Sequence, residues 1–112
     1  MYRKNICQKC GILFTFSDSK PRSFWMKNTI ISLDIIFIDT NGKIVAISEN
    51  TIPQNDKILY LSNYPAQFVL EVNAGFSKSN NINSGDSISI EKIRQKSIPY
   101  RFVDENGDQV SF

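Results

Sequence analysis

The segment from Leu33 to Ser48, LDIIFIDTNGKIVAIS, constrains the fold more than any other part of the chain. Its first half has the length and the β-branched content of a strand, and apolar residues occupy both faces of that strand except at Asp34. Asn41-Gly42 is the dipeptide that a tight type I′ turn prefers, and a second apolar run follows it. We therefore predict a β-hairpin over Leu33–Ser48.

Further strands are indicated by apolar, β-prone composition. They are expected at residues 11–16 (GILFTF), 68–72 (FVLEV) and 87–93 (SISIEKI). Residues 24–28 are also expected to be extended, with Trp25 and Lys27 on the same side. All of these runs are short, which is typical of a small β domain.

The segments between the strands are rich in turn-forming residues. Residues 17–23 contain Pro21, which cannot donate to a ladder, so this segment is predicted to be a connection. Residues 49–67 are predicted to form a long connection, of a length usual for functional or mobile loops, and residues 73–86 to hold one short helical turn. We therefore expect a mainly β fold, either a small antiparallel sandwich or a partly open barrel with little helix.

The composition excludes several chemistries. The chain contains no histidine, so Ser-His-Asp and Cys-His nucleophiles and imidazole ligands are ruled out. Cys7 and Cys10 supply two of the about four ligands that a structural zinc site needs, so we expect no metal and no cofactor. A redox dithiol, incidental cysteines and metal sharing between chains stay open as readings of this pair, although no βαβ context for a dithiol is found.

The charge and hydropathy also limit the partners. Lys and Arg number 13 against 11 Asp and Glu, and no basic stripe with interleaved aromatics is found, so no nucleic-acid partner is expected. No apolar run approaches the ~20 residues of a membrane span. As written, the chain is expected to be cytoplasmic; a missing upstream signal segment would place it in the envelope or outside the cell.

The runs FWMKNTIISLDIIFID, PAQFVLEVNAG and INSGDSISI together resemble the bacterial and archaeal domain-of-unknown-function family 192. The resemblance covers Met1 to about Ile90, and it implies a small β-rich sandwich or half-barrel. It implies no particular reaction. Relative to the family pattern, the chain lacks an N-terminal strand and helix, so we expect an unpaired sheet edge that favours self-association.

Two other departures from the family pattern affect the expectations. Ser32 stands where the family usually has proline, which loosens the approach to Asp34. The tail after residue 90 has no family counterpart. We expect residues 1–112 to form one domain, with a C-terminal extension over 91–112 that holds a hairpin at Asn106-Gly107.

Polar groups set into these otherwise apolar runs form the candidate site. They are Trp25, Lys27, Asn28, Asp34 and Glu71, and we predict that they line one small pocket. Each also has a structural explanation: the indole as part of the core, the lysine as a side chain covering the sheet, the asparagine in a bend, and the carboxylates as ion-pair partners.

Three functions are compatible with these residues, and no catalytic residue can be named. The favoured hypothesis is a noncatalytic module that binds a small polar or carbohydrate-like ligand, with Trp25 stacking on its apolar face. The first alternative is a hydrolase that uses Asp34 and Glu71 as paired carboxylates. The second is an interaction protein that pairs through an exposed sheet edge.

Overall fold

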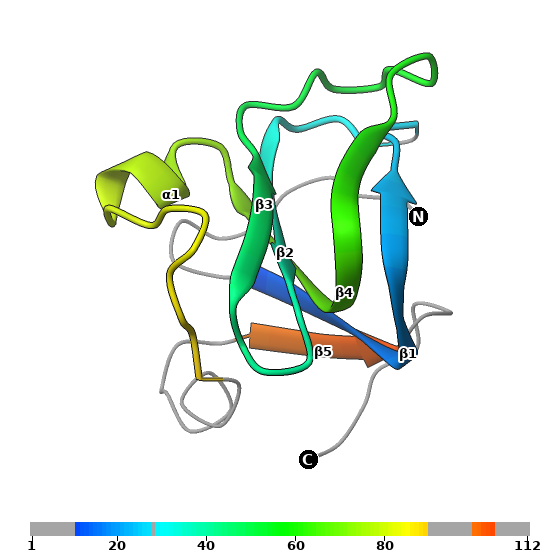
Figure 1. The fold of residues 1–112 in the computed structure, drawn as a ribbon. Coiled ribbons are helices and arrows are strands. Elements are labelled where there is room, and N and C mark those ends of the chain that lie inside the picture. Colours follow the sequence, from blue (N-terminus) through cyan, green and yellow to red (C-terminus); the bar gives the residue numbers. More distant parts are fainter. Residues whose placement is uncertain (1–10, 28, 90–99, 105–112) are drawn as a thin grey trace.

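The computed structural model describes residues 11–27 and 29–89, and the backbone of 100–104. These residues form a mainly β fold with one short helix, as expected (Figure 1). The elements are β1 (Gly11–Phe24), β2 (Leu33–Ile38), β3 (Ile44–Ser48), β4 (Tyr60–Asn73), α1 (Phe76–Ser79) and β5 (Tyr100–Asp104). The strands form one open sheet in the order β3-β2-β4-β1-β5, in which all neighbours are antiparallel except β1 and β5.

The long strands β1 and β4 bend together, and this bend gives the sheet its curl. Their pairing has irregularities between Thr15 and Lys20 and between Pro21 and Ser23. Beyond the bend, the Phe24 ring lies 5.5 Å from Phe14 and 6.0 Å from Phe37, both in edge-on contacts. The far end of the β1–β4 ribbon therefore folds back over one face of the sheet, which matches the expectation of a partly open barrel (Figure 1).

The curl divides the apolar residues into two clusters. The inner core lies inside the curl and contains Ile12, Phe14, Met26, Leu33, Ile35, Phe37, Ala66 and Val69. The outer core lies on the other face and contains Leu13, Ile36, Ile38, Ile44, Leu70 and Val72. Because both faces are covered, β2 is buried along its whole length, which explains why both of its faces are apolar except at Asp34.

One predicted connection is wrong, and another is too long, because their residues belong to strands. Residues 17–23 are part of β1: Arg22 donates from Nε to the Ala66 carbonyl at 2.9 Å and from its guanidinium to Asp18, and it lies over the Phe16 ring at 3.9 Å. These contacts hold a proline-containing segment in the ladder. The second connection covers only residues 49–59, since β4 already begins at Tyr60.

The predicted extended segment 24–28 is also wrong in part. The ladder ends at Phe24, and a turn follows in which the Thr29 N–H donates to the Met26 carbonyl at 3.1 Å. The expected alternation of side chains holds nonetheless, because Met26 is buried while Trp25 and Lys27 are exposed.

The hairpin over Leu33–Ser48 is confirmed, but its turn is not type I′. Type I′ needs positive φ at both central residues, and within this turn only Gly42 has it, at 87°. Asp39 organises the turn instead, because its Oδ1 accepts the N–H groups of Asn41 at 2.8 Å and Lys43 at 2.9 Å. The turn therefore contains one left-handed residue, Gly42, and is held by the Asp39 carboxylate.

The C-terminal part of the chain is described only in pieces. The expected helical turn is confirmed as α1, and of the expected strand over 87–93 the described residues show an isolated bridge between Ser87 and Lys43. The expected turn at 106–107 lies outside the described residues. β5, which belongs to the C-terminal extension, pairs in parallel with β1 and occupies the side of β1 that faces away from β4.

Candidate functional site

Trp25 and Lys27 are the two candidate residues that the structure brings together. Trp25 is 48% exposed, and Lys27 Nζ lies 5.3 Å from the centroid of its ring, within the range of a cation–π contact. Between them, Met26 is buried in the inner core and its N–H donates to the Asn55 carbonyl at 3.1 Å. The anchored methionine therefore turns both neighbours outward.

Asp34 is fully buried in β2, and its carboxylate is satisfied by backbone groups. Oδ1 accepts the N–H groups of Asn50 at 3.0 Å and Gly75 at 3.3 Å, and Oδ2 accepts that of Ser77 at 3.0 Å. Gly75, the residue preceding α1, makes no side-chain capping bond. A carboxylate from a distant strand therefore caps the helix.

Glu71 lies on β4 between Ile12 of β1 and Ile35 of β2, and it is 5% exposed. Both isoleucines belong to the inner core. Glu71 is engaged in an interaction, so it is not an isolated buried charge. Asn28, the fifth candidate, lies outside the described residues.

The strand register separates the two candidate carboxylates. Glu71 is paired with Ile35, and Asp34 with Val72, so Asp34 and Glu71 project from opposite faces of the sheet. A two-carboxylate glycosidase needs one acid on each side of the glycosidic bond, with the two carboxyl groups about 5–10 Å apart in one cleft. The arrangement therefore gives no support to hydrolysis by this pair, and the described residues contain no cluster of metal ligands.

Asn55 shapes the loop beside Trp25 and was not among the predicted site residues. Its Oδ1 accepts the N–H groups of Lys57 at 2.8 Å and Ile58 at 2.9 Å, while its carbonyl accepts that of Met26. Asparagine two residues after Pro53 is a turn signal, but the partner across the structure is not visible in the sequence.

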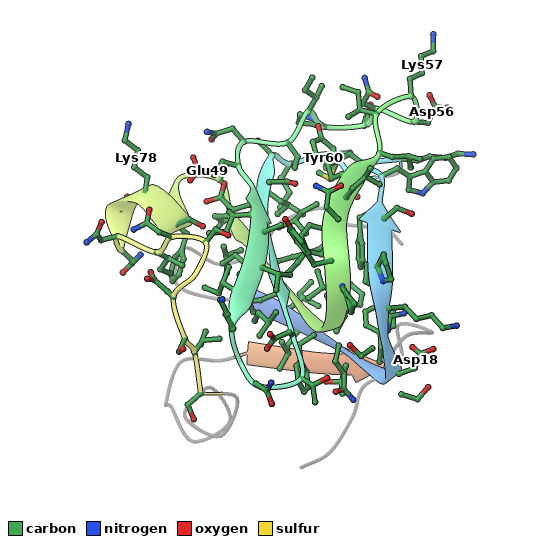
Figure 2. All side chains as sticks on the ribbon, viewed as in Figure 1. Asp18, Glu49, Asp56, Lys57, Tyr60 and Lys78 are labelled. Atoms are coloured by element: carbon green, nitrogen blue, oxygen red, sulfur yellow. The ribbon has the colours of Figure 1, made fainter. Side chains whose placement is uncertain are left out.

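Apolar side chains gather around this loop. In the described part of the chain, the exposed large apolar residues at or beside this loop are Trp25, Ile30, Ile52, Ile58, Leu59 and Leu61, which we call the apolar end. They come from two segments joined by the Met26–Asn55 bond and by a bond from Gln54 N–H to the Thr29 carbonyl at 2.7 Å. Figure 2 shows charged Asp56 and Lys57 at the tip of the loop, beyond Tyr60.

Comparison with known proteins supports the fold and gives no activity. The model of the family DUF192, described as Uncharacterized ACR, matches residues 1–90. No curated protein matches the chain. No helix in the described part of the chain is long and apolar enough to cross a membrane.

Two solved structures are similar to this chain. A Sinorhizobium meliloti protein, provisionally described as a transcription regulator, is 39% identical with a TM-score of 0.72, and the match covers 78% of this chain and 67% of that one. A Novosphingobium aromaticivorans protein of unknown function is 31% identical with a TM-score of 0.73, covering 80% and 63% respectively. This chain therefore spans about two thirds of each relative.

Proposed function

The chain belongs to the uncharacterised DUF192 family, and within this family we propose that it acts as a noncatalytic binding module for a small polar or carbohydrate-like ligand. The observation that carries the proposal is the half-exposed Trp25 ring with Lys27 Nζ 5.3 Å from its centroid. The ligand contacts would come from these two side chains and from Asn28, which follows them in the sequence.

The chemistry of the pair fits such a ligand. An exposed indole presents a flat apolar face on which the C–H face of a sugar ring can stack, and its N–H remains available to a hydroxyl. The ammonium of Lys27 carries three donors for hydroxyl or carboxylate oxygens. A single aromatic with one cation orients a ligand without supplying a nucleophile or a base.

The buried carboxylates have a supporting role in this proposal. Asp34 holds Asn50, at the start of the 49–59 loop, and the same loop carries Asn55, whose carbonyl anchors Met26 beside Trp25. Glu71 lies in the face of the sheet that the curled ribbon covers. Both residues are therefore expected to position the binding surface rather than to contact the ligand.

Intrinsic fluorescence tests this proposal directly, because Trp25 is the only tryptophan in the chain. The protein is titrated with a panel of neutral and acidic mono- and oligosaccharides, and both the emission and the thermal midpoint are followed. A true ligand is expected to change the emission and, at 100 times its Kd, to stabilise the fold by about 2.7 kcal/mol. No product should form on prolonged incubation.

Variants then assign the contacts, with calorimetry as the readout because the indole is removed. Trp25→Ala is expected to abolish binding, and Lys27→Ala to weaken it. Tyr64→Ala is the matched control, since Tyr64 is an aromatic residue that is 61% exposed and lies in β4 next to Pro65, which pairs with Pro21 of β1. Unchanged binding by Trp25→Ala, or a panel in which nothing binds, would contradict the proposal.

A further inference from the structure

We propose that residues 74–88, which we call the strap, open as one unit away from the outer core, and that Asp34 is the side chain that holds the strap closed. The strap contains α1 and the turns that follow it. Figure 1 shows it on the opposite side of β2 and β3 from the bent β1–β4 ribbon. The proposal concerns this face alone and does not depend on ligand binding at Trp25.

The strap is bonded to the sheet at its two ends. At the first end, Gly75 and Ser77 donate to the Asp34 carboxylate, and Ala74 N–H donates to the Ser32 carbonyl at 3.3 Å. At the second end, the strap bonds the edge of β3 and its turn: Ile44 N–H donates to the Asp86 carbonyl, Gly85 N–H to the Ile44 carbonyl, and Ile88 N–H to the Gly42 carbonyl, at 2.7 to 2.8 Å.

Between these ends, the backbone bonds among the described residues stay within the strap. Ser79 donates to Gly75, Asn80 to Phe76 and Ile82 to Ser77, at 2.8 to 3.0 Å. A helix of four residues is too short to persist alone in water, so these bonds depend on the attachment of the ends. Loss of one end is therefore expected to release the whole segment.

The strap makes few apolar contacts with the described part of the sheet. Phe76, Ile82 and Ile88 pack on the outer core and are only partly buried, whereas most residues from Lys78 to Ser87 are exposed. The sheet beneath contains Ile36, Leu70 and Val72, which are at most 2% exposed. A segment with few buried contacts over a tightly packed sheet belongs to the low-stability part of a fold. Opening uncovers an apolar surface that the closed form hides.

Asp34 accepts two of the three bonds described at the first end of the strap, and bonds to a carboxylate are roughly twice as strong as bonds to a neutral acceptor. In Asp34→Asn, one of the two oxygens becomes an amide donor. If the amide nitrogen takes the place of Oδ1, it faces the N–H groups of Asn50 and Gly75; if it takes the place of Oδ2, it faces that of Ser77. In either orientation at least one bond to the strap is lost. The same substitution at Asp18, which pairs with Arg22 in β1, leaves the strap untouched and serves as the control.

Native-state hydrogen exchange on the unmodified protein is the first test. The amides of Ser79, Asn80 and Ile82 are expected to share one opening free energy and to exchange at least about tenfold faster than the amides of Val69 and Val72 in β4. Exchange of strap amides only through global unfolding, at the rates of the β4 amides, would overturn the proposal. This test does not depend on any variant folding.

Two variants test the cause of opening. Asp34→Asn is expected to speed exchange of the strap amides by a further factor of about ten, and Asp18→Asn to leave it unchanged. Asp86→Ala perturbs the other end, because it removes the Oδ2 that accepts the Asn83 N–H at 2.8 Å. If the strap opens as one unit, Asp86→Ala speeds exchange at Ser79 as much as at Ile82; acceleration confined to residues next to residue 86 would refute the single unit.

Discussion

Two serines that are both fully buried are expected to respond in opposite ways to the same substitution. Ser62, in β4, accepts the Arg22 N–H at 2.8 Å and donates to the Tyr64 carbonyl at 2.7 Å. Ser77, in α1, places its Oγ where the described residues offer it no hydrogen-bond partner. Burial and size are matched, so the main difference between the two positions is their hydrogen bonding.

The magnitudes follow from what each alanine leaves behind. Ser62→Ala leaves a backbone N–H and a carbonyl without their partner, which costs about 1–2 kcal/mol of unfolding free energy. Ser77→Ala removes a buried hydroxyl that is already unpaired, and alanine is also the better helix former, by about 0.5 kcal/mol. We expect Ser77→Ala to be neutral or to stabilise the protein by up to about 1 kcal/mol.

Urea denaturation of the two variants and the unmodified protein measures this difference. The midpoints are compared at equal slope, because a changed slope would mean that the denatured state had changed as well. In thermal unfolding, each 1 kcal/mol corresponds to a shift of roughly 4 °C for a domain of this size. The reasoning is refuted if Ser77→Ala destabilises the protein as much as Ser62→Ala does.

Two further predictions concern a surface carboxylate and a glycine turn. Hydrogen bonding to the Arg22 guanidinium, and then to Lys20, holds the pKa of Asp18 below its ordinary value of 3.8, so its stabilisation is present above that pH and lost as the pH falls. The stability difference between the unmodified protein and Asp18→Asn, measured by urea midpoints from pH 7 to pH 2, should shrink below about pH 4; a constant difference would contradict this. Gly42→Ala should cost about 1–3 kcal/mol, since Gly42 has a φ of 87° and a Cβ there would meet the Ile88 carbonyl oxygen. Gly85→Ala, with a similar φ of 96° but open space around it, should cost less in the same assay; equal losses would show that the Ile88 contact is unimportant.

The parts of the fold that were predictable from sequence depend on local patterns. The β2–β3 hairpin follows from two apolar runs around Asn41-Gly42, and α1 from a turn-rich segment of the right length. The extent of β1 and β4 was not predictable, because Pro21 lies opposite Pro65 and each proline, taken by itself, predicts the end of a strand. It is the long-range bond from Arg22 to the Ala66 carbonyl that keeps this region in the ladder.

The candidate site was predicted less well than the fold. The alternation around Met26 correctly indicated that Trp25 and Lys27 lie on one side, and the structure shows that this side is exposed. It did not indicate that Asp34 and Glu71 face opposite ways, because that depends on the register between β2 and β4, and a shift of one residue reverses every side chain. The partners of Asp34 are backbone groups, which leave no signature in the sequence.

The order of strands in the sheet has a consequence for how the chain reaches this structure. β2 and β3 are the only neighbours in the described sheet that are joined by a short turn, whereas Gly11 pairs with Val72 in one direction and with Tyr100 in the other. Closing such long loops costs entropy before any contact compensates for it, so topologies of this kind fold slowly. The β2–β3 hairpin is therefore expected to form first, and the rate of folding to be set by the encounter of β4 with β1.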